Sequence, residues 1–163
     1  MGVSGSDKST VGSLLATEMG WAFADGDDLH PAANVAKMRA GQPLDDADRQ
    51  PWLAAVGDWI DGRAAAGEPA VVACSALRRR YRDRLRGGRP QLLLVYLAVD
   101  RATAARRLTG RGDHFFPPQL LESQFLALEE PEADEEAIVV RGEGLSWSVP
   151  LLLAGLRNRG VAC

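Results

Sequence analysis

The sequence predicts an α/β fold in which helices cover both faces of a parallel sheet. Three observations predict it. Candidate helices and strands alternate along the chain, the strand candidates are continuous apolar runs, and no repeat or low-complexity tract divides the 163 residues. Continuous apolar runs are typical of parallel strands buried on both faces. The length predicts a single domain spanning residues 1–163.

Hydrophobic spacing and turn residues predict the individual elements. In chain order we expect helix 9–19, strand 21–23, helix 33–39, helix 45–66, strand 70–74, helix 81–86, strand 92–99, helix 101–109, helix 117–129, strand 138–141 and helix 149–158.

Each half of the chain has features that support these elements. In the first half, apolar residues recur at helical spacing over 9–19, an acidic turn closes the first strand, and Gly41 ends the next helix. Asp45 or Asp46 can cap the long helix, which carries one apolar face. In the second half, two glycines end helix 81–86, and the run 92–99 is the strongest strand candidate.

Composition excludes several classes of protein. Charged residues make up 25% and apolar residues 46%, which is ordinary for a folded domain. The net charge of −3 argues against a protein that coats nucleic acid. No apolar run approaches the roughly 20 residues of a membrane span, and no signal segment opens the chain. Cys74, Cys163 and two histidines form neither a disulfide framework nor a zinc pattern, so we expect a soluble cytoplasmic protein.

Residues 2–9, Gly-Val-Ser-Gly-Ser-Asp-Lys-Ser, nearly match the phosphate-binding motif G-x-x-x-x-G-K-[ST]. In that motif backbone N–H groups surround phosphates at a helix N-terminus. Lys8 would reach the outer phosphates, and the Ser9 hydroxyl would bind Mg²⁺. The nucleotide-binding candidates are Gly2, Val3, Ser4, Gly5, Ser6, Asp7, Lys8, Ser9 and Thr10.

Two features depart from the motif. Asp7 stands where the motif requires a second glycine, which predicts roughly 1–3 kcal/mol of backbone strain. Its carboxylate would also repel a phosphate by about 3 kcal/mol per charge at about 5 Å and an effective dielectric constant of about 20. No strand precedes the loop, so an accidental match in a Gly/Ser-rich tail is the alternative.

Further landmarks join the loop in a specific order over about residues 1–140. They are Asp25-Gly26-Asp27-Asp28-Leu29-His30-Pro31, Asn34, Lys37-Met38, Gly41-Gln42-Pro43-Leu44, Asp48-Arg49, Pro51-Trp52-Leu53, residues 73–83, Arg111-Gly112-Asp113-His114-Phe115, Ser123-Gln124-Phe125, residues 128–131 and Asp134-Glu135. Together they resemble the gluconokinase family, small kinases that phosphorylate D-gluconate with ATP. The resemblance implies a three-layer P-loop kinase fold with a parallel sheet and a small helical lid at about 107–125. It also implies ATP, Mg²⁺ and a possible homodimer.

The chain departs from the family pattern in four places. The strand before the loop is apparently missing, for which a start codon assigned too late is the simplest explanation. Asp7 and Asp113 replace glycines, and residues 141–144 replace an acidic turn. These departures motivate a catalytically impaired binding protein as one alternative. A kinase of another small polyol acid is a second.

The resemblance assigns roles to the acidic turn. Asp25 would help to hold Mg²⁺ through water, and Asp27 would bind substrate hydroxyls and orient or deprotonate the attacking one. Both carboxylates follow a strand at its C-terminal end, where open α/β sheets bind ligands. The alternative is a solvated acidic turn that caps a helix.

Arginines are the candidates for binding anionic groups. Arg49 and Arg78 would bind the gluconate carboxylate, because guanidinium matches a carboxylate bidentately. Arg107 would bind nucleotide, and Arg111 would stabilise the transferred phosphoryl group, with His114 on the lid facing substrate. Surface charge pairing is the alternative for Arg49 and Arg78, a solvated helix face for Arg107, and an exposed histidine for His114.

Two groups of residues have a second interpretation. Seven arginines lie between residues 78 and 89. They could form a patch that binds nucleic acid, but we favour a solvated helix around one or two anion-binding arginines. Trp52, Trp59 and Phe125 are expected in the core rather than stacked on ligand. Cys74 is expected to be a small buried residue.

Overall fold

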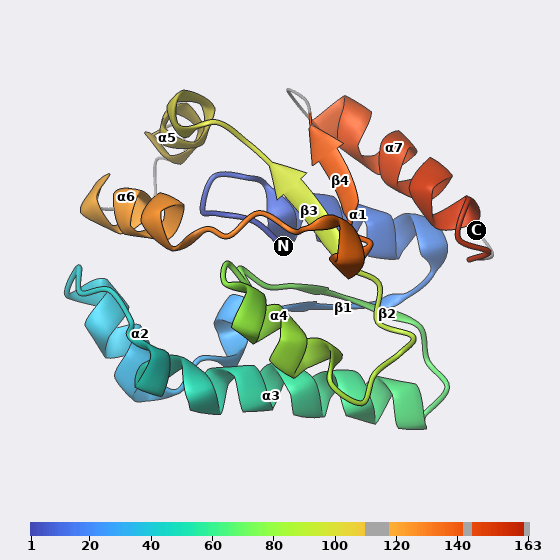
Figure 1. Ribbon diagram of the computed structural model, residues 1–163, viewed down its shortest axis with the longest axis horizontal. Coiled ribbons are helices and arrows are strands. Elements are labelled where there is room, and N and C mark those ends of the chain that lie inside the picture. Colours follow the sequence, from blue (N-terminus) through green and yellow to red (C-terminus); the bar gives the residue numbers. More distant parts are fainter. Residues whose placement is uncertain (110–117, 142–144, 162–163) are drawn as a thin grey trace.

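The computed structural model describes residues 1–109, 118–141 and 145–161 (Figure 1). Its elements are α1 Lys8–Met19, β1 Ala22–Asp25, the 3₁₀ helix η1 Gly26–Leu29, α2 Ala32–Arg39, α3 Asp46–Ala65, β2 Ala70–Ala73, α4 Arg79–Arg86, β3 Val95–Ala98, α5 Arg101–Thr109, α6 Pro118–Ala127, the 3₁₀ helix η2 Ala133–Glu135, β4 Ile138–Arg141 and α7 Leu145–Arg157.

Every predicted helix and strand is present, and most boundaries agree within two residues. The strand expected over 92–99 is shorter, because the Leu92 amide donates to the carbonyl of Arg89 in a turn. The last helix begins at residue 145 rather than 149. Asp45 caps α3 as expected, and Asp48 closes a capping box with it at 2.9 and 3.0 Å.

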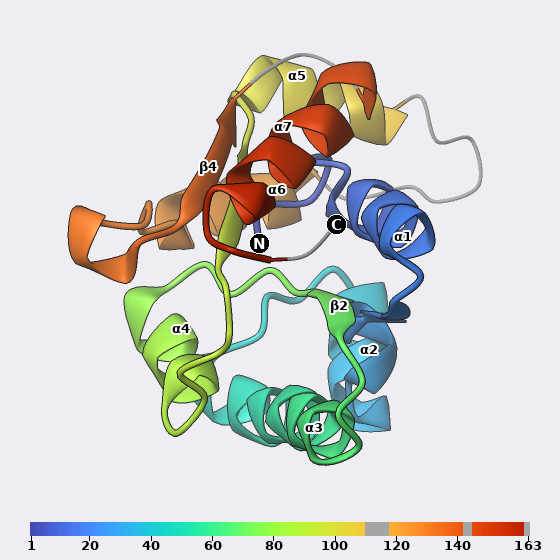
Figure 2. The same cartoon turned by 90° about the vertical axis from the view of Figure 1, so that its right-hand side faces the viewer.

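The strands form two parallel pairs rather than the single sheet that we expected. β1 pairs with β2, ending at Asp25 opposite Ala73, and β3 pairs with β4. Figures 1 and 2 show β3 and β4 on one side with α5, α6 and α7, and β1 and β2 on the other with α2, α3 and α4. Helix α1 packs against β1, β2 and α7, so it joins the two halves.

The first two residues of the chain lie between the two strand pairs. The Leu97 amide donates to the Met1 carbonyl at 3.0 Å, and the Met1 ammonium donates to the carbonyl of Val95. On the other side, the Gly2 amide donates to the Ser75 carbonyl at 3.3 Å. Met1 therefore continues the parallel hydrogen-bonding pattern beside β3 and leads directly into the phosphate-loop motif.

A cavity of about 620 Å³ lies beside Met1, and both strand pairs line it. Its apolar walls include Val71, Val95, Leu97, Leu15, Ile60 and Leu152. An apolar side chain that packs into this space would contribute about 1.5–3 kcal/mol on burial.

The terminal ammonium of Met1 makes stability depend on pH. Burial lowers its pKa from 8.0 to about 5. Between these values the unfolded chain binds a proton that the folded chain does not. The free energy of unfolding should therefore rise by about 1.4 kcal/mol per pH unit from pH 5 to pH 8, about 4 kcal/mol in all.

Urea titrations across this pH range measure the effect. A chain acetylated at the Met1 nitrogen is the control, because it has no ammonium and should lose most of this slope. Equal slopes for the two chains would contradict this origin of the pH dependence.

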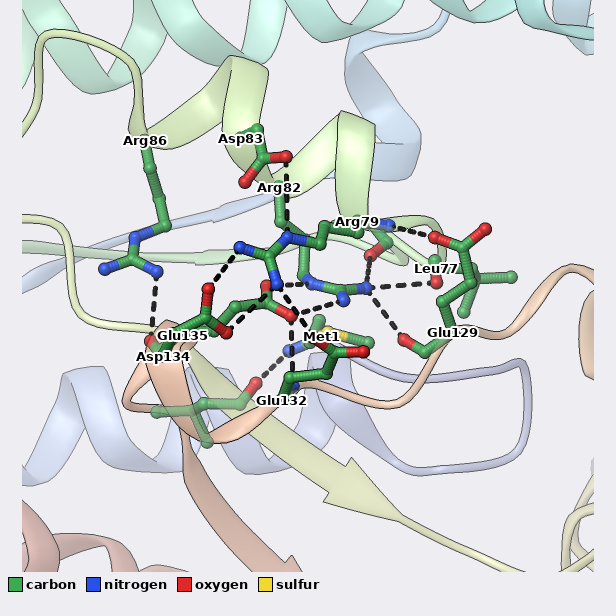
Figure 3. A network of polar contacts seen from close by, with 12 residues as sticks. Met1, Leu77, Arg79, Arg82, Asp83, Arg86, Glu129, Glu132, Asp134 and Glu135 are labelled. Carbon is green, nitrogen blue, oxygen red and sulfur yellow. Dashed lines mark hydrogen bonds and ion pairs between the residues drawn. The ribbon is translucent and has the colours of Figure 1, made fainter.

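A polar network joins α4 to the segment that contains η2 (Figure 3). Arg82 on α4 and Glu135 on η2 form a buried ion pair with 2.5 and 2.7 Å contacts. Arg82 also donates to the carbonyls of Leu77 and Glu129, at 3.1 and 2.9 Å. Arg79 adds contacts to the carboxylates of Glu129, Glu132 and Asp134. The network fixes the segment after β2 against the segment that leads from α6 to β4.

Glu135→Gln should destabilise the fold by about 3 kcal/mol, because it leaves the buried Arg82 guanidinium without its counter-charge. The measurement is the free energy of unfolding at pH 7. Asp134→Asn is the matched control, since Asp134 pairs with Arg79 at the exposed surface and should cost less than about 1 kcal/mol. A loss for Glu135→Gln no larger than that of the control would contradict the account.

Three apolar clusters form the core. Trp52, Leu53 and Val56 of α3 pack with Tyr81 and Leu85 of α4. A second cluster joins α1, β3, β4 and α7, and a third joins the loop to α5 and α6. Within the described residues no helix is long and apolar enough to cross a membrane.

Candidate active site

The phosphate-loop motif is a closed turn that leads into α1. Val3 is buried among Leu77, Ala104 and Leu121, which anchors the middle of the loop. Gly5 has φ +79°, and a Cβ there would lie 2.5 Å from the carbonyl oxygen of Ala104. Glycine is therefore required at position 5 both by its backbone angle and by the close approach of α5.

Asp7 has the left-handed conformation that the motif's second glycine would supply, with φ 62° and ψ 23°. Aspartate tolerates this region better than most residues, so the position keeps its shape. Its carboxylate lies 3.1 Å from the Arg107 guanidinium of α5, which also donates to the Gly5 carbonyl at 3.3 Å. The sequence placed both residues at the nucleotide but missed this ion pair, because 100 residues separate them.

Gln124 of α6 holds the other side of the loop. Its Oε1 accepts from the Ser4 amide at 2.6 Å, and its Nε2 donates to Ser4 Oγ at 2.9 Å. Gln124 was only a landmark in the sequence, and the glutamine alone gave no signal for this contact. The loop is thus fixed by α5 and α6, the helices at the two ends of the expected lid.

The loop has the features of an anion-binding site. Ser6 is 5% exposed, and within the described chain its Oγ is buried without a hydrogen-bond partner. Lys8, Ser9 and Thr10 form the first turn of α1, which contains no acidic residue. A helix N-terminus with a lysine and free backbone N–H groups favours a bound phosphate.

The acidic turn lies at the C-terminal ends of β1 and β2. Asp25 ends β1, and its Oδ1 accepts from the Asp27 amide at 3.0 Å. Asp25 therefore caps the 3₁₀ helix η1, as expected from the alternative interpretation of the acidic turn as a helix cap. Asp27 is exposed, and its charge raises the pKa of both His30 and Cys74. Asp27 therefore lies near both of these side chains.

His30 belongs to this site, although the sequence analysis gave it no role. Its ring stacks on Trp52 with 4.5 Å between centroids and 9° between planes. Burial lowers the pKa of His30, and Arg49 adds to this, while Asp27 opposes it. Its ring is therefore neutral at pH 7, available as a donor or an acceptor. In the sequence His30 stood only among the landmarks of the resemblance, with no role assigned.

Trp52 is completely buried, which confirms its predicted place in the core. Its Nε1 donates to the Gly26 carbonyl at 2.6 Å. This contact fixes the acidic turn against α3. Phe125 packs against the third core cluster, while Trp59 lines the cavity between the strand pairs. Cys74 is buried as expected, and burial raises the pKa of its thiol to about 12.

Arg49 of α3 contacts Tyr81 of α4 directly, and Arg78, the N-cap residue of α4, reaches it through Asp46. The Arg49 guanidinium lies 5.7 Å from the ring centre and donates to the Leu44 carbonyl at 3.2 Å. Arg78 lies 3.8 Å from Asp46, which also accepts from the Tyr81 hydroxyl. The Tyr81 contact, followed by Arg80 and Arg78, lowers the pKa of Asp46. Asp46 and Tyr81 were not predicted as site residues.

The arginine-rich stretch is not the solvated helix that we expected. Arg82 is 1% exposed in its ion pair with Glu135. Arg79 and Arg80 pair with carboxylates of η2 and α3, and Arg89 pairs with Asp61 at 2.5 Å. The arginines join helices instead of forming a free basic surface, so the nucleic-acid interpretation has no support in their contacts.

Three predicted positions lie outside the described residues. They are Arg111, Asp113 and His114, in the segment 110–117 between α5 and α6. Their roles stay predictions.

Comparisons with known proteins agree with this geometry. A family model described as an AAA domain matches residues 1–131. A gluconokinase of Gluconobacter oxydans is 51% identical over 143 residues, which cover 88% of this chain and 80% of the relative. The thermoresistant gluconokinase of Escherichia coli is 46% identical over 140 residues, covering 86% and 80%.

A solved structure agrees as well. The crystal structure of a gluconokinase from Sinorhizobium meliloti superposes with a TM-score of 0.88 at 45% identity, covering 98% of this chain and 90% of the other. On the family model, the relatives and the fold, the chain belongs to the gluconokinase family.

Proposed function

We propose that this chain transfers the γ-phosphoryl group of ATP to the terminal hydroxyl of D-gluconate, forming 6-phospho-D-gluconate and ADP. The observation that carries the proposal is the anion-binding loop before α1, in a chain whose acidic turn stands at the C-terminal ends of β1 and β2. The loop leads into α1, Asp27 follows the end of β1, and Arg49 and Arg78 lie near the start of α3 and at the N-cap of α4. Phosphoryl transfer needs this positioning and charge stabilisation more than covalent chemistry.

The loop fits a nucleotide polyphosphate. The unpartnered Ser6 hydroxyl and the N–H groups at the start of α1 are donors for phosphate oxygens. Lys8 adds a positive charge at the same place. Ser9 and Asp25 would hold Mg²⁺, which proteins bind through one or two oxygen ligands together with substrate phosphates. When bound, Mg²⁺ would neutralise part of the negative charge on the phosphates.

The acceptor side fits a sugar acid. Arg49 and Arg78 would bind its carboxylate, and Asp27 would orient the attacking hydroxyl and accept its proton. Neutral His30 can hydrogen-bond a further hydroxyl. Arg111 would stabilise the transferred group and His114 would contact gluconate, as the sequence pattern implies. A cytoplasmic location and a homodimer also stay predictions.

Initial rates of ADP formation with a panel of acceptors test the proposal. We expect D-gluconate to be the preferred acceptor over shikimate and over neutral polyols without a carboxylate. Arg78→Ala should raise KM for gluconate about 10-fold to 100-fold, because one charge-assisted bidentate contact is lost, while KM for ATP changes little.

Arg84→Ala is the matched control, since Arg84 lies on α4, the helix that Arg78 precedes, and is exposed. It should leave both KM values unchanged. A preference for another acceptor, or an unchanged KM for gluconate in Arg78→Ala, would overturn the assignment of the acceptor site.

A further inference from the structure

The ion pair between Asp7 and Arg107 connects the phosphate loop to the helix that leads into segment 110–117. Both side chains are about one-fifth exposed, at 18% and 20%, so water screens the pair only in part. Arg107 is held at two points, by the Asp7 carboxylate and by the Gly5 carbonyl. Both contacts are on the loop itself, which places the guanidinium at the wall of the proposed phosphate site.

Asp7 is also the N-cap residue of α1, but its side chain does not cap the helix. A carboxylate at this position would normally accept from the first backbone N–H groups. Here it is turned toward α5 instead. The N–H groups of the first turn therefore stay available to another anion, while the carboxylate neutralises the one arginine nearest to the loop in the described part of α5.

We propose that Asp7 acts as an internal competitor of the nucleotide phosphate for Arg107. This inference rests on the proposed function of the loop in binding nucleotide. In the nucleotide-free chain the carboxylate holds the guanidinium. A bound phosphate replaces the Asp7 carboxylate as the partner of the guanidinium. Part of the attraction between Arg107 and the phosphate is therefore used to break the existing ion pair. Asp7 thereby weakens nucleotide binding and makes it less sensitive to salt.

Direct binding of ADP and ATP, measured by calorimetry without gluconate, tests the proposal. Asp7→Asn removes the charge and keeps a residue that tolerates the left-handed conformation. We expect it to bind both nucleotides about tenfold more tightly. The affinity of Asp7→Asn for nucleotide should also fall more steeply as the salt concentration rises. In this variant the phosphate displaces salt ions from Arg107, whereas in the parent chain it displaces the Asp7 carboxylate.

Two further variants separate charge from backbone effects. Asp7→Gly should tighten binding as Asp7→Asn does, and should in addition raise the melting temperature by relieving the left-handed conformation. Glu18→Gln is the matched control, because Glu18 is exposed on the same helix and carries the same charge. It should change neither the affinity nor its salt dependence.

A double-mutant cycle shows whether Asp7 acts through Arg107. We expect Arg107→Ala to weaken nucleotide binding at least threefold more in the Asp7→Asn background than in the parent chain. Equal factors in both backgrounds, or no tightening in Asp7→Asn, would overturn the competition. Because these measurements need no acceptor, the competition can fail while gluconate is still phosphorylated, and it can hold if gluconate is not the acceptor.

Discussion

Five β-branched apolar residues added before Met1 should raise the free energy of unfolding by about 5 kcal/mol. The space beside Met1 has the hydrogen-bonding edges of β2 and β3 on its two sides, each a strand of four residues. Each β-branched side chain that packs against this apolar lining contributes about 1.5–3 kcal/mol. Ordering five residues costs about 1.5 kcal/mol each. The melting temperature should rise by about 10–20 °C.

An extension of five glycine and serine residues is the control for this variant. It supplies the same peptide bonds but no apolar volume, so its gain should stay below about 2 kcal/mol. Both extensions replace the Met1 ammonium by an amide and should therefore remove the stability slope between pH 5 and pH 8. Equal stabilities of the two extended chains would show that the cavity does not limit the fold.

Asp27→Asn should lower kcat for gluconate phosphorylation by about 10²–10⁴-fold. Asparagine keeps the size of the side chain but cannot accept the proton of the attacking hydroxyl. Because Asp27 is exposed and lies away from the loop's anchoring contacts, the melting temperature and KM for ATP should change little. Steady-state kinetics with varied ATP and gluconate measure the two constants separately.

Asp28→Asn is the control, because Asp28 is the next residue of the same 3₁₀ helix and is equally exposed. It should keep at least half of the parent kcat. If Asp27→Asn also keeps most of its activity, Asp27 does not act as the base. A raised KM with unchanged kcat would instead assign it to binding alone.

The secondary structure was predictable where local patterns decide it. Helix 101–109 and strand 138–141 agree with α5 and β4 at both ends, because short apolar or amphipathic runs stand between clear turn residues. Strand 92–99 was predicted too long, since Leu92 and Leu93, which begin it, line the cavity and stand before the strand itself. The division into two strand pairs depends on tertiary spacing, which no local pattern reports.

The sequence predicts which residues belong to the candidate site, but not the contacts that hold them in place. The motif predicts the phosphate loop, and the position of Asp25 and Asp27 after a strand predicts them as site residues. The partners that fix these residues come from distant parts of the chain. Arg107 lies 102 residues from Gly5, and Gln124 lies 120 residues from Ser4. A single sequence has no signal for such pairs, and the buried Arg82 was predicted to be solvated for the same reason.

The measurement that tests the account most directly is the yield of both products when the chain is incubated with Mg·ATP and D-gluconate. Phosphorus NMR resolves ADP and the phosphate ester, and it identifies the carbon that carries the phosphoryl group. We expect ADP and 6-phospho-D-gluconate in a one-to-one ratio, with Asp7→Gly run beside the parent chain. A folded chain that binds ATP but forms no 6-phosphate ester, in the parent and in Asp7→Gly alike, would contradict the proposed activity.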